Sequence, residues 1–185
     1  MAKIISLEGP KGSGKSTLAN LLQDKGYLLK KFDDKHLLSY EDFETDANQV
    51  FDRGALSHTI YNFLWGNEID LLKQQSDFSY RYFKTLRPLD INDYDFLMRS
   101  VDVYVIFYSS NEQLLVDRIR YRALRTGKGA REDEWYDLKL SNQLYKAWGQ
   151  FLSYAYPDTV RFIDIANQAE VDALYEELGI EYSKW

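Results

Sequence analysis

The chain has 185 residues, of which 45% are hydrophobic and 28% charged, so it can bury an ordinary core and is neither disordered nor a disulfide-stapled miniature. It has no Cys and two His, which excludes thiolate metal sites and a cysteine nucleophile. Its 29 acidic residues outnumber its 23 basic ones, which argues against stable nucleic-acid binding. We expect one soluble, cytoplasmic domain over residues 1–185, because no apolar run suits a membrane span or a secretory signal.

The first half of the chain alternates short apolar runs with helical patterns. Leu18, Leu21 and Leu22 repeat at helical spacing after a glycine-rich loop, and Gly26 stops that pattern. A polar connection with one or two helical turns is expected over 36–47. Strands are expected at 4–7, 27–32 and 49–51, and helices at 16–25, 55–65 and 69–86.

The second half contains the longest apolar run, 101–108, which is typical of a strand buried on both faces of a parallel sheet. Residues 97–100 are expected to close a loop before it. Helices are expected at 111–124, 133–154 and 170–178, with a last strand at 160–164. Strands separated by helices in this way predict parallel units with right-handed crossovers, and hence a three-layer α/β domain.

Residues 9–16 read Gly-Pro-Lys-Gly-Ser-Gly-Lys-Ser, which fits the phosphate-binding loop of nucleoside-triphosphate-binding proteins. Glycines allow backbone N–H groups to converge on phosphate oxygens, and the following helix adds its positive dipole end. Lys15 then reaches the terminal phosphates, and Ser16 offers a hydroxyl to Mg²⁺. The residues expected to bind ATP are Gly9, Lys11, Gly12, Ser13, Gly14, Lys15, Ser16 and Thr17.

Asp52 and Arg53 follow the third expected strand, at the edge of the sheet where ligands bind in open α/β folds. A carboxylate there can hold Mg²⁺ or accept a proton, and an arginine can clamp a phosphate. The alternative is a surface salt bridge.

Six cations and no acid occur in residues 118–131, with Gly127 and Gly129 inside the segment. Mobile guanidinium groups that close on a migrating phosphoryl group stabilise its charge, so a lid over about 118–133 is expected. Arg118 and Arg122 share one helix face. The alternative is a solvated helix end that favours the dipole.

These features together resemble the thymidylate kinases. The family writes Asp-Arg-Tyr, Ser-Ser and Ala-Tyr-Gln where this chain has residues 52–54, 57–58 and 60–62 at identical spacing. The order of elements is also similar to that of the deoxynucleoside kinases. The resemblance implies the P-loop NTPase fold, with a five-stranded parallel sheet and a helical lid, and phosphoryl transfer from ATP with Mg²⁺.

The chain departs from the family at several acceptor positions. Lys11 stands where the family has an acid that binds the sugar 3'-hydroxyl, and lysine cannot accept that hydrogen bond, so sugar recognition must differ. Gly54, His58 and Asn62 replace a tyrosine, a serine and a glutamine. The base and the sugar of the acceptor therefore stay open.

We predict an ATP-dependent kinase that transfers the γ-phosphoryl group to a deoxynucleoside monophosphate. A deoxynucleoside kinase, with Asp33, Asp34 or Asp52 as base, and a nucleotide-binding regulatory protein are the alternatives. The expected catalytic residues are Lys15, Asp52, Arg53, Arg118, Arg122, Arg125 and Arg131. Asp33, Arg53, Ser57, Tyr61 and Asn62 are expected to bind the acceptor, and Ser16 and Asp52 the Mg²⁺. The expected partners are small nucleotides or nucleosides and, because related kinases are commonly dimers, a second copy of the chain.

Overall fold

The computed structural model describes residues 3–31, 40–65, 91–127 and 133–181. Five strands form one parallel sheet in the order β2-β3-β1-β4-β5, so β1 lies at its centre. The strands are β1 (Ile4–Glu8), β2 (Leu28–Lys31), β3 (Gln49–Asp52), β4 (Val103–Tyr108) and β5 (Val160–Asp164). The helices are α1 (Lys15–Asp24), α2 (Ala55–Trp65), α5 (Ile91–Ser100), α6 (Glu112–Thr126), α7 (Asp133–Ala155) and α8 (Gln168–Glu177), with a 3₁₀ turn at Tyr40–Phe43.

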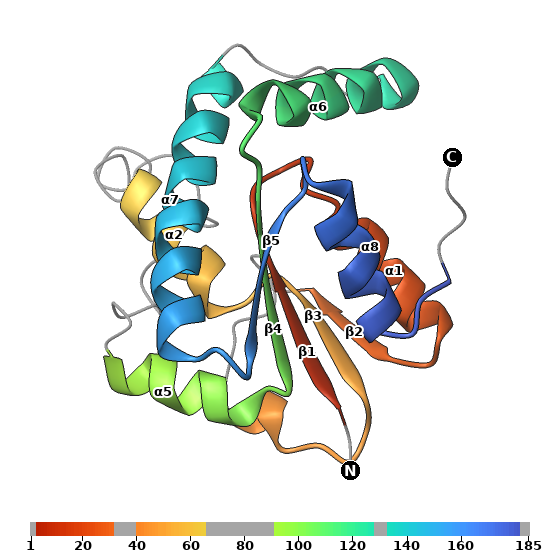
Figure 1. Ribbon diagram of the computed structural model, residues 1–185, viewed down its shortest axis with the longest axis vertical. Coiled ribbons are helices and arrows are strands. Elements are labelled where there is room, and N and C mark those ends of the chain that lie inside the picture. The colour runs from red at the N-terminus through yellow and green to blue at the C-terminus, as the bar shows by residue number, and fades with distance from the viewer. Residues whose placement is uncertain (1–2, 32–39, 66–90, 128–132, 182–185) are drawn as a thin grey trace, which may run out of the picture.

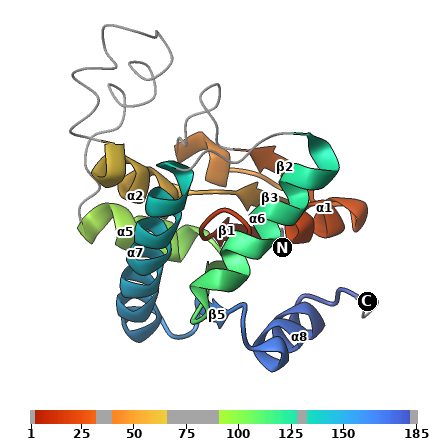
Figure 2. The ribbon, with the colours of Figure 1, turned by 90° about the horizontal axis from the view of Figure 1, so that it is seen from above.

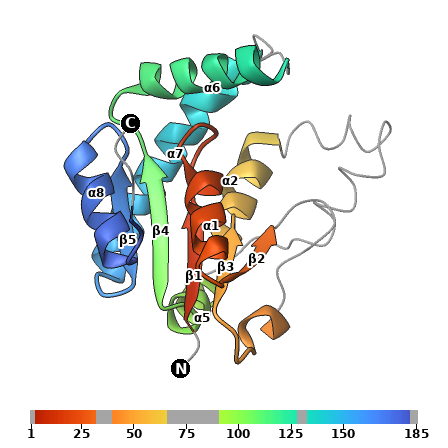
Figure 3. The same ribbon diagram turned by 90° about the vertical axis from the view of Figure 1, so that its right-hand side faces the viewer.

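Helices cover both faces of the sheet, which makes three layers (Figure 1). Helices α1 and α8 lie on one face, and α2, α5 and α7 lie on the other. Figure 3 shows the strands side by side in this order, with β2 and β5 at the two edges. The sequence predicted this α/β architecture with its parallel five-stranded sheet, and the prediction is confirmed.

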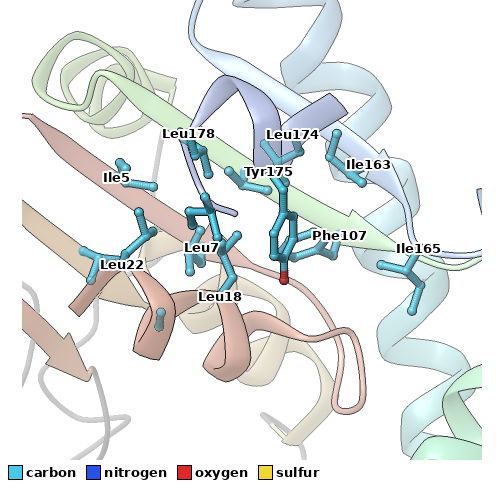
Figure 4. Packing of buried hydrophobic residues seen from close by; sticks show 14 of the residues in the cluster. Ile5, Leu7, Leu18, Leu22, Phe107, Ile163, Ile165, Leu174, Tyr175 and Leu178 are labelled. Carbon is cyan, nitrogen blue, oxygen red and sulfur yellow. The ribbon is translucent and has the colours of Figure 1, made fainter. Parts of the chain in front are cut away.

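Successive side chains of the central strand enter two different cores, as the period of two in a strand requires. Ile5 and Leu7 pack with Leu18 and Leu22 of α1 and with residues of α8 (Figure 4). Ile4 packs on the opposite face, among residues of α2, α5 and α7. Glu8, two residues beyond Ser6 on that second face, is also fully buried, so a carboxylate lies inside the protein.

The prediction for residues 97–100 is wrong. They were expected to close a loop, but they form the last turns of helix α5. Tyr94, Leu97 and Met98 are buried at helical spacing. The sequence conceals this pattern, because Asn92 and Asp93 precede Tyr94 and Asp95 follows it, and such residues disfavour helix interiors when judged by propensity alone.

The other described elements lie where the sequence predicts them, with ends that differ by a few residues. The helix expected at 69–86 lies outside the described residues, as do Asp33, Asp34 and Arg131. Of the loop expected after α6, residues 128–132 also lie outside them. No helix within the described ranges has both the length and the apolar character needed to cross a bilayer.

Candidate active site

The phosphate loop joins the central strand β1 to α1. Gly14 is the N-cap of α1 and adopts φ 96°, and Gly12 adopts φ 79°, in the left-handed region that suits glycine. Gly9 has φ 147°, and a Cβ on it would lie 2.8 Å from the Cβ of Phe107. The loop therefore depends on glycine both for its backbone shape and for its close approach to β4.

Lys15 is buried at the start of α1. Its Nζ donates to the carbonyl of Pro10 across 2.9 Å and to the Ser13 hydroxyl across 3.4 Å. Burial, together with the nearby positive charge of Arg53, lowers the pKa of Lys15 to about 7. Because burial disfavours the charged form of Lys15, a bound anion such as a phosphate would stabilise that form.

Ser16 and Asp52 are in contact at the carboxyl edge of the sheet. The Ser16 Oγ donates to Asp52 Oδ2 across 2.9 Å, although the residues are 36 apart in the chain. The pairing of β1 with β3 brings the end of β3 beside the phosphate loop. A hydroxyl and a carboxylate in contact are oxygen ligands of the kind that Mg²⁺ takes when phosphates supply the rest, so these residues fit the ion. No cluster of three or more acidic or histidine ligands occurs in the part of the chain that the structure describes.

Arg53 adopts φ 74°, the one left-handed non-glycine residue within the described ranges. Its backbone N–H donates to the carbonyl of Leu7 across 3.0 Å. Its guanidinium lies over the ring of Tyr61, 5.2 Å from the ring centroid. Arg53 also lines the same pocket as the phosphate loop, so its charge faces the place where a polyphosphate would bind.

The arginines of α6 divide into two groups. Arg118 and Arg122 line the pocket, and Arg118 Nη1 donates to the carbonyl of Gly12 across 3.2 Å. Seen from above, α6 crosses the end of the sheet beside the phosphate loop (Figure 2). Arg125 lies about one turn further along the same helix stripe, is exposed 5.8 Å from the ring centroid of Tyr121, and is not among the residues that line the pocket.

The pocket has a volume of about 370 Å³. Besides the loop residues 11–17 and three arginines, it is lined by Phe107, Ile165, Gln168, Val171 and Tyr175. These five form a mostly apolar wall at the ends of β4 and β5 and along α8. The sequence analysis did not assign any of them to the site. Their only signal is that Phe107 and Ile165 lie at the carboxyl ends of two strands, where ligands bind in open α/β sheets.

Ser57 lies in the interior instead of on the pocket wall. It is buried, its hydroxyl donates to Glu8 Oε2, and it lies 2.7 Å from the hydroxyl of Tyr145. Tyr61 is buried beneath Arg53. Nothing is described of the side chain of Asn62. Of the residues expected to bind the acceptor, the structure thus brings Arg53 and Tyr61 together and directs Ser57 inward.

Glu8 is a buried group to which the sequence analysis assigned no role. Burial raises the pKa of its carboxyl, although hydrogen bonds from Ser57 and Tyr104 act in the opposite direction. Leu56 and Ser57 N–H groups also donate to it. Its partners come from β4 and α2, far along the chain, so no sequence pattern reveals them.

No protein-family model and no curated protein sequence matches this chain. Solved structures do match it in three dimensions, and the fold is similar to that of a deoxyadenosine kinase. A deoxyadenosine kinase from M. mycoides with bound dCTP superposes with a TM-score of 0.54 at 18% sequence identity, covering 95% of this chain and 98% of that one. The same enzyme with bound dATP gives 0.54, and with the products dCMP and dCDP 0.52, at the same identity. They cover 95% of this chain and 99% and 98% of those chains, respectively.

Proposed function

We propose that this protein is an ATP-dependent kinase that phosphorylates a deoxynucleoside-type acceptor. One observation carries the proposal: two segments meet at one pocket, where Lys15 and Ser16 at the start of α1 and Arg53 after β3 line the wall and Asp52 beside it accepts from Ser16. Phosphoryl transfer needs positioning and charge stabilisation more than covalent chemistry, and this set provides both. The likeness of the fold to a deoxyadenosine kinase supports it.

In the proposed reaction, the loop amides and Lys15 bind the β- and γ-phosphates of ATP, and Arg118 and Arg122 neutralise charge from the α6 side. Ser16 and Asp52 would hold Mg²⁺. The ion, when bound, offsets the charge that develops on the phosphate oxygens. The apolar wall with Phe107 and Tyr175 would exclude water from part of the donor nucleotide.

The acceptor that we propose first is a deoxynucleoside monophosphate. Arg53 places a guanidinium at the carboxyl end of β3, where it can clamp the acceptor phosphate while stacked on Tyr61. No carboxylate is among the residues that line the pocket in the described part of the chain, which suits a doubly anionic pair of substrates. A monophosphate oxygen is already ionised and needs no base.

A deoxynucleoside is the second candidate acceptor, and the similarity of the fold to a deoxyadenosine kinase favours it. Its 5'-hydroxyl needs a carboxylate to accept the proton during attack. Asp52 is such a group near the loop, although its Oδ2 already accepts from Ser16.

The test is a coupled assay that offers each deoxynucleoside and each monophosphate with ATP and Mg²⁺. Turnover of monophosphates supports the first acceptor, and turnover of nucleosides alone replaces it with the second. ATP binding and slow hydrolysis without any acceptor would instead support a regulatory protein. The Lys15→Met variant serves as the inactive control, because it keeps the length of the side chain and removes the charge.

A further inference from the structure

Glu8 links the phosphate loop to the segment that carries Asp52 and Arg53. It is the last residue of β1, directly before Gly9, and its carboxylate is fully buried. Glu8 Oε1 accepts from Leu56 N across 3.0 Å and from the Tyr104 hydroxyl across 2.7 Å. Glu8 Oε2 accepts from Ser57 N across 3.2 Å and from the Ser57 hydroxyl. Both carboxylate oxygens are thus fully used as acceptors.

Two of these donors are backbone amides in the first turn of α2, those of Leu56 and Ser57. Helix N-terminal N–H groups lack partners within their own helix and are usually capped by a nearby side chain of the same segment. Here the cap comes from Glu8, which is 48 residues from Leu56. The start of α2 is therefore fixed to β1 by a charged group rather than by its own sequence.

The segment that this cap holds contains a strained residue. Arg53 is left-handed, at φ 74°, which a residue with a Cβ adopts only when its surroundings require it. Gly54 follows in close contact with β1, and a Cβ on it would lie 2.7 Å from Ser6 Oγ and 3.0 Å from Glu8 Oε1. Together with the bond from Arg53 N to the carbonyl of Leu7, these contacts hold the turn at residues 52–54 against β1.

We propose that Glu8 is a positioning residue for phosphoryl transfer, which caps α2 so that the strained turn keeps Arg53 and Asp52 facing the phosphate loop. The proposal rests on the kinase function proposed above. Glu8 itself does not touch the substrates, because its carboxylate is enclosed by Leu56, Ser57 and Tyr104. Its effect should therefore appear on the acceptor step and leave ATP binding intact.

Glu8→Gln tests this inference with little change of shape. The glutamine amide has one acceptor oxygen, and an NH₂ group replaces the other carboxylate oxygen. In either orientation this NH₂ group faces a backbone N–H donor of α2, that of Leu56 or that of Ser57, and so one of the two bonds to the helix is lost. Tyr145→Phe is the matched control. It removes a buried hydroxyl bonded to Ser57 Oγ in the same network but leaves the bonds from Glu8 to the α2 amides in place. Both variants should lose stability, so stability alone does not distinguish them.

The measurements are steady-state kinetics for acceptor and ATP, and amide hydrogen exchange of Leu56 and Ser57. For Glu8→Gln we expect kcat to fall at least about tenfold, an ATP KM within about twofold of the wild type, and exchange at both amides at least about tenfold faster. For Tyr145→Phe we expect kcat and exchange within about twofold of the wild type. Equal kinetic losses in the two variants would overturn the proposal, as would a kinetic loss in Glu8→Gln without faster exchange.

Two further experiments keep the inference testable if Glu8→Gln does not fold or if the wild type is inactive. If Glu8→Gln does not fold, Ser57→Ala removes the side-chain bond to Glu8 together with the contact to Tyr145, which Tyr145→Phe removes by itself. We expect about a threefold fall in kcat with an unchanged ATP KM for Ser57→Ala; no change overturns the inference. If the wild type phosphorylates no acceptor, the proposed function fails. The exchange of Leu56 and Ser57 in Glu8→Gln then still decides whether Glu8 holds the turn, and unchanged exchange overturns that as well.

Discussion

The hydroxyl of Ser16 donates to the carboxylate of Asp52 across 2.9 Å, which joins the first turn of α1 to the end of β3. The contact exists because β1, which leads into the phosphate loop, pairs directly with β3 in the sheet. Two residues that the sequence suggests separately for Mg²⁺ therefore form one unit. Their joint position makes the metal requirement of the protein a direct test of the site.

Asp52→Asn should lower kcat about a hundredfold and raise the Mg²⁺ concentration needed for half-maximal turnover. The amide oxygen can still accept from Ser16, so the geometry is kept while the negative charge that holds the ion is lost. The measurement is a Mg²⁺ titration of turnover, with Asp158→Asn, at a surface turn, as control. Unchanged Mg²⁺ dependence in Asp52→Asn would remove this residue from the metal site.

Lys15→Met should strongly weaken ATP binding while the protein stays folded. The Nζ of Lys15 is the buried cation of the loop, and its loss removes the charge that meets the phosphates. We expect the affinity for ATP, measured by calorimetric titration, to fall by a hundredfold or more, equivalent to about 3 kcal/mol. Lys11→Met is the control, because Lys11 is exposed at the rim and should cost less than about tenfold. Wild-type affinity in Lys15→Met would contradict the assignment of the phosphate loop.

The stability of the protein without nucleotide should rise with pH above about 7, owing to Lys15. Its pKa is lowered from 10.5 to about 7 in the folded protein, mainly by burial, so the unfolded chain binds more protons between these two values. Stability then increases with pH across that window, by at most about 1.4 kcal/mol per pH unit from this group.

Urea unfolding of the wild type and of Lys15→Met at several pH values between 7 and 10 isolates this contribution. The difference in unfolding free energy between the two proteins should change with pH in the stated direction. A difference that is constant over this range would mean that Lys15 is charged in the folded state throughout.

The sequence predicts the donor side of the site better than the acceptor side. Residues 9–17 are contiguous, and their spacing alone specifies a loop between a strand and a helix. Glu8 escapes such reasoning because its partners, Leu56, Ser57 and Tyr104, come from distant elements. Ser57 was expected at the acceptor on the basis of family spacing, yet its hydroxyl is directed inward by that same carboxylate.

The fold shows the same distinction between local and distant information. Strand β4 is predictable because it is buried on both faces and therefore apolar throughout. Helix α5 is not, because three of its first five residues are polar, and its inner face is revealed only by the burial of Tyr94, Leu97 and Met98 in the folded protein. Residues such as Tyr175 join the pocket wall through packing that no periodic pattern encodes.

Gly9→Ala should disable the loop more severely than a glycine replacement elsewhere. At φ 147° an alanine is strained, and its Cβ would lie 2.8 Å from the Cβ of Phe107 and 3.0 Å from the Phe107 carbonyl oxygen. Neither atom can move without shifting β4, so the loop must move instead. We expect a loss of about 3 kcal/mol in unfolding free energy and a fall in ATP affinity of at least about tenfold.

Gly26→Ala is the matched control for this prediction. Gly26 has φ 94°, but nothing lies within 4 Å of the position of its Cβ, so only the backbone penalty of about 1–2 kcal/mol applies. Urea unfolding and ATP titration of the two variants separate backbone strain from steric overlap. Equal losses of stability with unchanged ATP affinity in both would show that the close approach of Gly9 to Phe107 does not shape the phosphate loop.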